Sequence, residues 1–323
     1  MGRWRRLALA GAAAALALVA CAGDDDSLSG LRIMVPNAPG SGYDATARTV
    51  AKALDDSRIA HSVEVFHLPG AGGTVGLQRM VHEKGNGQLL MLMGQGMVGA
   101  QYTHRSAATL EETTPIARLI EEPEIVVVSE NSPYDTLAEL TADWVADPSQ
   151  LTVGGGSTPG GPDHLAPMLI AKAIGIAPKD VTYVQHDGGG ALLAAILDER
   201  VAFGVSGVGE YADQIKSGQL QALAVTSEER HPSFPDVPTL QESEVDVVYV
   251  NWRGMVAPPG LHSADVEALQ DAIAELHASA EWRDVLVRNG WTDAFLAGAD
   301  FGAYIHDENA KLLAILTDLG LAA

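Results

Sequence analysis

Short apolar runs alternate with helical patterns along most of the chain, and this alternation restricts the fold more than any other feature. Between the runs, residues 47–54, 165–174 and 191–197 carry apolar side chains at helical spacing. The strand-like runs cover residues 31–35, 62–66, 88–94, 125–129, 151–155, 181–185, 202–206 and 222–226. Strands that alternate with helices predict an α/β fold with mostly parallel sheets.

The C-terminal part has a different pattern. After the apolar segment 247–260, the sequence predicts helices over 263–280, 281–289 and 300–319. The chain of 323 residues is long enough for two ordinary domains, and it predicts too many strands for one sheet without a seam. A ligand of such a protein lies between the lobes, at the carboxyl ends of strands. We therefore expect seams near Glu124 and Val250, with residues 31–124 plus 250–323 in lobe 1 and residues 125–249 in lobe 2.

The N-terminus predicts export from the cytoplasm. Three arginines within the first six residues precede an apolar stretch, Leu7 to Ala20, that is short for a transmembrane helix and typical of a signal peptide. The stretch ends in LVAC, which is similar to a bacterial lipoprotein signal with Cys21 as the lipidated residue. The alternative is an ordinary signal peptide with an incidental cysteine. We expect a signal peptide over 1–20 and an acidic, flexible tether over 21–30.

Composition excludes several classes of protein. Cys21 is the only cysteine, so the chain has no intramolecular disulfide and no cysteine-based metal site. A formal net charge of −22 repels nucleic acid and anionic lipid headgroups, so we expect neither as a partner. The same charge does not attract an anionic ligand from a distance. If the ligand is an anion, local donors must hold it.

Glycine-rich loops follow many of the predicted strands, and they supply such donors. Glycine permits close backbone approach, and a helix N-terminus offers unpaired N–H groups with a partial positive charge. The loops cover residues 38–44, 68–76, 94–99, 154–164, 186–191 and 206–210. Because most of them contain no lysine or arginine, we predict an anion site made of backbone amides, hydroxyls and water. Gln95 and Ser206 are further candidate ligand contacts in two of these loops. The alternative is that the glycines only form tight turns.

Other chemistries fit the sequence less well. The segment GAGGTVG at 70–76 has the wrong glycine spacing for a dinucleotide site, and the next strand does not end in an acidic residue. Ser157, His164 and His186 could form a hydrolytic or metal site. However, the serine is not in a G-x-S-x-G elbow, and the spacing matches no closed metal site. We expect no catalysis, no cofactor and no metal.

Two neighbouring residues in the last apolar segment leave alternatives open. Trp252 either packs in the core or forms a wall of the cleft, where it would be a ligand contact. Arg253 either forms a structural ion pair at the strand edge or binds a ligand carboxylate through both of its terminal nitrogens.

Five segments in register resemble one family, the extracytoplasmic solute receptors of tripartite tricarboxylate transporters, also called Bug receptors. The resemblance runs from about Leu31 to the C-terminus. The segments are NAPGSGYDATARTVAKAL (37–54), HLPGAGGTVG (67–76), TPIARLIEEPEIVVV (114–128), YVQHDGGGALLAAILDERVAFGVSG (183–207) and VPTLQESEVDVVYVNWRGMVAPPG (237–260).

The resemblance implies a two-lobe fold of the periplasmic-binding-protein type II kind, with hinged lobes that close on a small carboxylate. It also implies that two loops hold the ligand carboxyl group through backbone amides and bridging waters. Tyr43 departs from the family pattern, in which small residues are common there, and it either narrows the pocket or supplies a hydroxyl. By matching motif, the predicted contacts are Gly40, Ser41, Gly42, Tyr43, Asp44, Ser157, Thr158, Gly160, Gly161, Asp163 and His164, with Asp187, Gly188 and Gly189 facing them.

The implied function is that of a lipid-anchored receptor without catalytic activity. It would capture a small carboxylate, such as a di- or tricarboxylate, and present it to membrane permease subunits once both lobes have closed. We expect a monomer in the periplasm or on the outer face of the plasma membrane. Two alternatives stay open: a secreted hydrolase that uses Ser157 and His164, and a receptor that signals to a sensor kinase. The sequence does not name the ligand.

Overall fold

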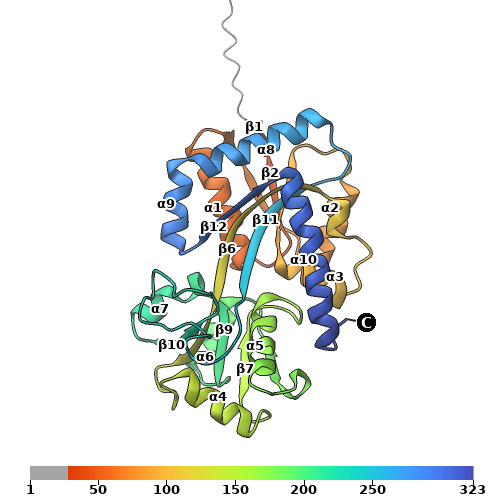
Figure 1. The fold of residues 1–323 in the computed structure, drawn as a ribbon. Helices are drawn as coiled ribbons and strands as arrows, with labels where there is room; N and C mark the ends of the chain where they lie inside the picture. The colour runs from red at the N-terminus through yellow and green to blue at the C-terminus, as the bar shows by residue number, and fades with distance from the viewer. Residues whose placement is uncertain (1–27, 323) are drawn as a thin grey trace, which may run out of the picture.

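The structure is a computed structural model that describes residues 28–322, and it contains two lobes joined by two long strands (Figure 1). The signal peptide, Cys21 and most of the predicted tether lie outside the described residues. The strands are β1 (Leu28–Ser29), β2 (Arg32–Val35), β3 (Ala60–His61), β4 (Glu64–His67), β5 (Leu89–Gly94), β6 (Thr114–Ser129), β7 (Thr152–Gly155), β8 (Thr182–Gln185), β9 (Phe203–Gly207), β10 (Leu220–Val225), β11 (Val250–Ala257) and β12 (Thr292–Ala297).

Helices cover both lobes. Four short 3₁₀ segments are η1 (Ala71–Gly73), η2 (Leu110–Glu112), η3 (Pro178–Asp180) and η4 (Val208–Glu210). The α-helices are α1 (Gly42–Asp56), α2 (Thr74–His82), α3 (Gln95–Thr103), α4 (Leu137–Ala146), α5 (Pro162–Ala173), α6 (Gly189–Leu197), α7 (Ala212–Lys216), α8 (Ser263–Ala278), α9 (Ala280–Asn289) and α10 (Gly298–Asp318). Among residues 28–322, none of these helices has the length and apolarity that crossing a bilayer requires.

The main sheet runs through both lobes in the order β4-β2-β5-β11-β6-β9-β7-β8, with β10 and β12 also paired to β6. Strand β2 is parallel to β4 and β5, and β7 is parallel to β8 and β9. Strands β6 and β11 are antiparallel to their neighbours, because the chain enters the second lobe through β6 and returns through β11. The predicted α/β, two-lobe fold is confirmed, but the sheet is mixed rather than mostly parallel.

Strand β6 is the longest strand and changes partners along its length. Residues 114–123 pair with β11, and residues 124–127 pair with β9. The sequence pattern predicted only its second half, because Arg118, Glu121 and Glu122 interrupt the apolar run of the first half. In the structure, Arg118 forms an ion pair with Glu121 at 2.6 Å, and Glu122 forms one with Arg253 at 2.7 Å. Each ion pair offsets the free-energy cost of removing its charges from water, so charged side chains can lie within the strand.

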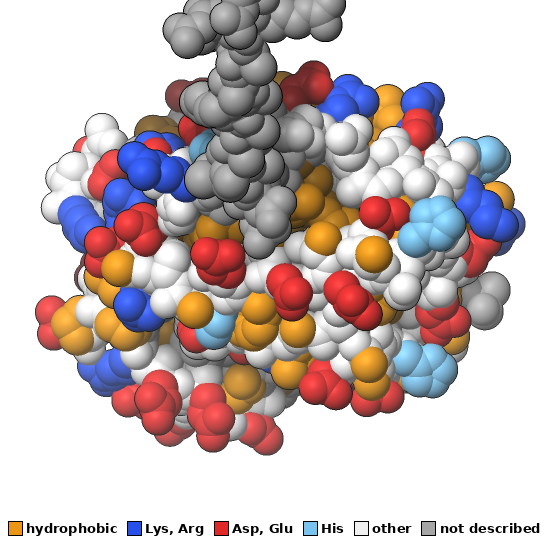
Figure 2. Space-filling view, turned by 90° about the horizontal axis from the view of Figure 1, so that it is seen from above, with side chains coloured by type: hydrophobic (Ala, Val, Ile, Leu, Met, Phe, Trp, Pro, Cys, Tyr) orange, Lys and Arg blue, Asp and Glu red, His pale blue; other side chains and the backbone are white. Residues whose placement is uncertain are grey.

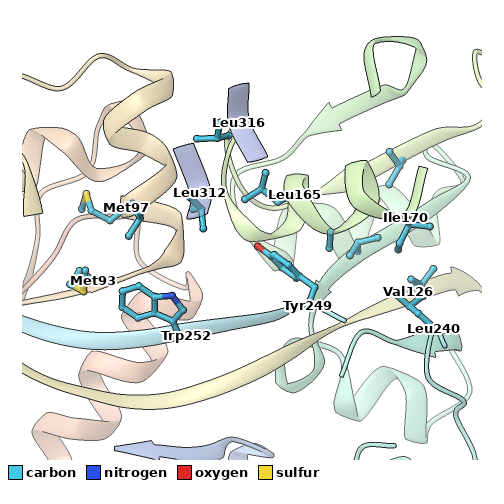
Figure 3. Packing of buried hydrophobic residues seen from close by; sticks show 14 of the residues in the cluster. Met93, Met97, Val126, Leu165, Ile170, Leu240, Tyr249, Trp252, Leu312 and Leu316 are labelled. Carbon is cyan, nitrogen blue, oxygen red and sulfur yellow. The ribbon is translucent and has the colours of Figure 1, made fainter. Parts of the chain in front are cut away.

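The last helix extends the core from lobe 1 into lobe 2. Leu312 and Leu316 of α10 belong to the same buried apolar cluster as Leu165 and Ile170 of α5 (Figure 3). At the surface, Lys172 of α5 forms an ion pair with Asp318 at the end of α10. The two lobes therefore touch along α10 as well as through the crossing strands.

The final residues of the predicted tether differ from the expectation. Leu28 and Ser29 form a short parallel strand with Ala60 and His61. The N–H group of Leu28 donates to the carbonyl of Ile59 at 3.1 Å, and the Leu28 side chain packs against a buried cluster. These backbone hydrogen bonds and the burial of the Leu28 side chain offset the conformational entropy that the two residues lose when they become ordered.

The end of the molecule formed by lobe 1 carries charges of both signs. In Figure 2, which looks onto this end, acidic side chains are interspersed with smaller groups of basic side chains and with scattered apolar ones. Where the described residues form this face, Figure 2 shows no continuous basic stripe of the kind that binds nucleic acid.

The packing of Trp252 in the core can be tested by substitution. Its indole is 1% exposed, and its ring centre lies 5.9 Å from that of Phe301 and 5.2 Å from that of Tyr304. We expect Trp252→Ala to lower the free energy of unfolding by about 3–5 kcal/mol, measured by urea denaturation. Val287→Ala is the control, since Val287 is 82% exposed. A loss of less than about 1 kcal/mol for Trp252→Ala would contradict this packing.

Candidate functional site

A cavity of about 360 Å³ lies between the two lobes. Lobe 1 lines it with the loop before α1, with η1 and with the crossing strand β11, and lobe 2 lines it with the loops before α5 and α6. The lining residues are Pro36, Asn37, Ala38, Ser41, Gly42, Tyr43, Pro69, Gly70, Ala71, Gly72, Gly73, Gly96, Glu124, Gly156, Ser157, Thr158, Gly161, Pro162, Asp163, Gln185, His186, Asp187, Gly188, Gly189, Gly207, Glu210, Asn251 and Arg253.

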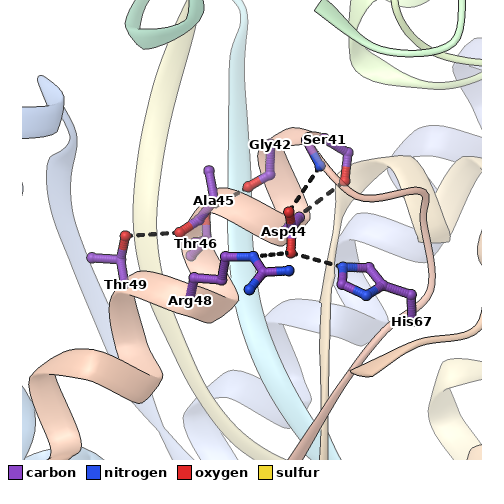
Figure 4. Close-up of polar contacts among 9 residues, drawn as sticks. Ser41, Gly42, Asp44, Ala45, Thr46, Arg48, Thr49 and His67 are labelled. Carbon is purple, nitrogen blue, oxygen red and sulfur yellow. Dashed lines mark hydrogen bonds and ion pairs between the residues drawn. The ribbon is translucent and has the colours of Figure 1, made fainter. Parts of the chain in front are cut away.

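The loop before α1 is shaped by its own side chains (Figure 4). Ser41 is the N-cap of the helix and accepts the N–H of Asp44, whose carboxylate accepts the N–H of Gly40 at 2.8 Å. Gly40 has a φ of +84°, which favours glycine there. The first two helical N–H groups, those of Gly42 and Tyr43, have no intrahelical acceptor and belong to residues that line the cavity.

Asp44 supports this loop from behind the cavity wall. Its carboxylate also lies 2.8 Å from Arg48 and 2.7 Å from His67. Burial alone would raise the pKa of Asp44, but the Gly40 N–H, His67 and Arg48 outweigh it and lower the pKa. Asp44 is thus an ionised group that holds the loop in place.

The loop before α5 repeats this design with different partners. Asp163 accepts the N–H of Gly156 at 2.8 Å and the hydroxyl of Ser206 at 2.9 Å. The N–H of Asp163 donates to Ser157 Oγ at 3.1 Å. Because Pro162 has no N–H group and the N–H of Asp163 is already bonded, the first turn of α5 has few free N–H donors for a ligand. The available donors precede the helix: the N–H groups of Ser157 and Thr158 have no acceptor within residues 28–322.

A third loop, the one before α6, also lines the cavity. The N–H of Gly188 donates to the carbonyl of Gly156 at 3.1 Å, which ties this loop to the one before α5. Gly188 has a φ of +83°, and α6 begins at the next residue. Asp187, Gly188 and Gly189 all line the cavity.

The crossing strands place charged side chains at the cavity. Arg253 on β11 is buried, forms an ion pair with Glu122 at 2.7 Å and donates to Thr46 Oγ1 at 3.2 Å. Burial alone would lower the pKa of Arg253, but the carboxylates of Glu122 and Glu210 outweigh it and raise the pKa. Asn251 lies two residues earlier on the same strand, and Glu124 lies two residues after Glu122 on β6, so each pair shares one face of its strand.

Ten of the predicted contact residues line the cavity, and seven do not. Those that line it are Ser41, Gly42, Tyr43, Ser157, Thr158, Gly161, Asp163, Asp187, Gly188 and Gly189. Those that do not are Gly40, Asp44, Gln95, Gly160, His164, Ser206 and Trp252. Contact with a solute stays a prediction for both groups.

Three of the residues that do not line the cavity have identifiable partners within the protein. Ser206 donates to Asp163, and His164 accepts the N–H of Gly160 through Nδ1 at 3.3 Å. Burial lowers the pKa of His164 to about 4, so its ring is neutral at pH 7. Trp252 points away from the cavity, because side chains alternate along a strand and its neighbours Asn251 and Arg253 occupy the cavity face. Its indole N–H donates to Glu308 at 3.0 Å.

Tyr43 lies between the cavity and α3. Its ring lines the cavity, and its hydroxyl accepts the N–H of Met97 in the first turn of α3 at 3.3 Å. Burial, the largest effect, raises its pKa to about 12. The hydroxyl therefore ties α1 to α3.

Glu124, Glu210 and Asn251 line the cavity but were absent from the predicted contacts, and Arg253, whose role the sequence left open, lines it as well. A signal for three of them was present: polar residues two apart on otherwise apolar strands, as in EEPE and NWR, predict a polar face. The position of Glu210, in η4 after β9, carried no such signal.

The geometry does not assemble a hydrolytic or metal site from the predicted residues. Ser157 Oγ accepts the N–H of Asp163 and is not bonded to His164, whose Nδ1 accepts the Gly160 N–H. Among residues 28–322, no group of three or more histidine, aspartate or glutamate side chains is arranged to hold a metal ion.

Comparison with known proteins identifies the family. A sequence profile described as the tripartite tricarboxylate transporter family receptor matches residues 46–321. The protein BugT of Bordetella pertussis is 26% identical over 295 residues, which cover 90% of this chain and 89% of BugT.

Solved structures share the fold. A crystal structure of a TctC solute binding protein from Polaromonas is 26% identical, with a TM-score of 0.66, and covers 90% of this chain and 98% of that one. A Rhodopseudomonas palustris protein with adipate is 20% identical, with a TM-score of 0.84, over 91% of this chain and 98% of that one. The family consists of solute-binding receptors and not of enzymes. The chain belongs to the tripartite tricarboxylate transporter receptor family.

Proposed function

We propose that this protein captures a small carboxylate-bearing solute between its lobes, outside the cytoplasm, and delivers it to the membrane permease subunits of a tripartite transporter. One observation carries the proposal: residues whose backbone N–H groups have no acceptor within residues 28–322 line the same cavity from both lobes. They are Gly42 and Tyr43 in lobe 1 and Ser157 and Thr158 in lobe 2. Such groups bind a carboxylate without a lysine or arginine.

The structural neighbours support a carboxylate ligand. One is MatC from Rhodopseudomonas palustris with bound malate, and another is the R. palustris protein with adipate. Within the described cavity wall, Arg253 is the one lysine or arginine, and Glu122 already neutralises it. Main-chain donors are therefore the principal groups available for a ligand carboxylate, beside Arg253 Nε, which has no acceptor within residues 28–322.

The lobes are proposed to close around the solute by bending where both crossing strands pass the seam. Strand β6 changes partners at Glu124, and β11 begins at Val250. Lobe 1 would comprise residues 31–124 and 250–323, and lobe 2 residues 125–249. The cavity has both walls in place only when the lobes touch, so the solute stabilises that state.

Lipid anchoring at Cys21 is proposed on the sequence LVAC and the acidic segment that follows it. An anchored receptor stays close to the permease, which raises its effective concentration there. We propose that the receptor acts as a monomer, because one chain supplies both walls of the cavity.

A screen of small carboxylates tests the ligand class. A solute present at about 100 times its Kd should raise the free energy of unfolding by roughly 2.7 kcal/mol, seen as a higher Tm. The screen includes mono-, di- and tricarboxylates and amino acids, with sugars and simple amines as controls. Stabilisation by sugars or amines alone, with none by any carboxylate, would overturn the proposed ligand class.

A wedge in the seam tests lobe closure. A Cβ on Gly99 of α3 would overlap the carbonyl of Gly160 in the opposite lobe. We expect Gly99→Ala to fold normally, because alanine favours a helix, and to bind solute about tenfold or more weakly by calorimetry. The control is Gly190→Ala, whose added methyl meets no atom within 4 Å. Equal affinity in Gly99→Ala and the wild type would argue against closure at this contact.

Metabolic labelling with an alkyne fatty acid tests the anchor. The wild-type protein should incorporate the label, and Cys21→Ser should not, because Cys21 is the only thiol. Ala22→Ser is the control for an altered signal sequence and should label normally. Absence of label from the wild type would leave an ordinary signal peptide as the explanation of the N-terminus.

A further inference from the structure

The cavity contains more carboxyl groups than its single guanidinium can balance. Glu124, Asp163 and Glu210 line it, and Glu122 forms an ion pair with Arg253, which also lines it. We call these four residues the acidic floor. Strand β6 supplies Glu122 and Glu124, the first turn of α5 supplies Asp163, and η4 supplies Glu210. Arg253 on β11 is the one cation among them.

Two of the four acids of the floor have partners within the protein. Glu122 lies 2.7 Å from Arg253 and accepts the N–H of Gly209 at 2.9 Å. Asp163 accepts the Gly156 N–H and the Ser206 hydroxyl. These two carboxyl groups have the donors that a buried acid requires.

Glu124 and Glu210 are different. Glu124 is 0% exposed and lines the cavity, and neither of its carboxyl oxygens has a hydrogen-bond partner within residues 28–322. Glu210 has only a long contact of 3.5 Å with the Ser206 hydroxyl. Asn251 Oδ1 and Asn37 Oδ1, also on the cavity wall, lack donors as well. Within residues 28–322, the unpaired side-chain atoms of the wall are thus mostly acceptors, with Arg253 Nε as the one unpaired donor, so a solute that fits the wall must bring hydrogen-bond donors for the acceptors.

Two glycines leave room for the carboxyl group of Glu210 at the cavity wall. A Cβ on Gly189 would overlap its Oε2, and a Cβ on Gly42 would lie 3.2 Å from its Oε1. The Glu210 carboxyl therefore occupies space beside the first turns of α1 and α6, where an anion would otherwise be stabilised. This leaves less room and less positive potential for a second carboxylate of the solute.

Combining these observations, we propose that the solute carries a protonated amino group as well as a carboxylate, and that Glu124 and Glu210 bind its ammonium. The inference rests on the proposed function and narrows its ligand class. The loop N–H groups hold the carboxylate, and the ammonium supplies the donors that the acidic floor lacks. A dicarboxylate would add a second negative charge beside unpaired acids.

The protonation of the unliganded floor agrees with this assignment. Burial, then the charges of Asp163 and Glu122, raise the pKa of Glu124 well above its usual value and that of Glu210 to about 8. Glu210 is therefore mostly protonated at pH 7, and the pKa of Glu124 is shifted in the same direction. An ammonium that binds a protonated acid must displace its proton. The ionisable groups around them are Glu122, Asp163, Arg253, Tyr43, Tyr183, Tyr211 and Tyr249.

Calorimetry with matched solutes tests the proposal. Each set differs in one terminal group: butyrate, 4-aminobutyrate and succinate, then hexanoate, 6-aminohexanoate and adipate, together with alanine and aspartate. In at least one set, the amino member should bind about tenfold or more tightly than its methyl and carboxylate counterparts, as expected for a charged hydrogen bond. If dicarboxylates bind and amino solutes show no advantage, the inference is overturned while the receptor function stands. If no carboxylate binds at all, the proposed function fails as well.

Glu124→Gln keeps the shape of the side chain and removes its charge. We expect it to weaken binding of the amino solute about tenfold or more and to leave binding of the methyl counterpart unchanged. Glu130→Gln, at the exposed end of β6, removes one charge outside the cavity and should have no effect. Glu210→Gln repeats the test if Glu124→Gln does not fold. Full affinity in the folded variants would overturn the role of these acids.

The pH dependence separates two ways in which the floor could act. If the acids bind an ammonium, they must be ionised, so affinity rises with pH up to about pH 8, the pKa of Glu210. An alkyl ammonium with a pKa of about 10.4 stays charged over this range. If the floor instead stayed protonated and donated to a solute carboxylate, affinity would fall as the pH rose through the same value. That result would refute the ammonium site.

Discussion

Both lobes share strand β6, and the arrangement of the site depends on this shared strand. Its first half pairs with β11 in lobe 1, and its second half pairs with β9 and β10 in lobe 2. The carboxyl groups of Glu122 and Glu124 lie where the partners change, and β11 brings Arg253 to the same place. A buried ion pair therefore stands at the junction of the two lobes. Breaking such a pair would leave an uncompensated charge, which strongly destabilises a protein.

The loops before α1 and α5 follow one plan, in which an aspartate of the first helical turn accepts an N–H of its own loop. The surroundings of the two aspartates differ. Burial is the largest single effect on the pKa of both, but Arg48, His67 and the Gly40 N–H together outweigh it at Asp44 and lower that pKa, whereas the pKa of Asp163 is raised. Asp44 thus has the Arg48 guanidinium as a partner, and Asp163 has only neutral donors.

Several glycines are needed because a side chain at their position would not fit, and not because they make the backbone flexible. Gly99 allows the lobes to meet, and Gly42 and Gly189 make room for the carboxyl of Glu210. A side chain at any of these positions would fill space that the cavity wall or the lobe contact occupies. The glycine-rich loops thus position the charged groups at the seam as well as exposing their own N–H groups.

The sequence by itself determined the α/β class, the C-terminal helices, the loops of the site and the family, because these depend on local periodicity and contiguous motifs. Only the tertiary structure decided that the sheet is mixed, that Trp252 belongs to the core, and that Arg253 pairs with Glu122. The partners of that pair are more than a hundred residues apart in the chain, and strand register sets which side chains face the cavity. Local pattern does not specify which strands become neighbours, so the acidic floor became visible only once β6, β11, α5 and η4 were brought together.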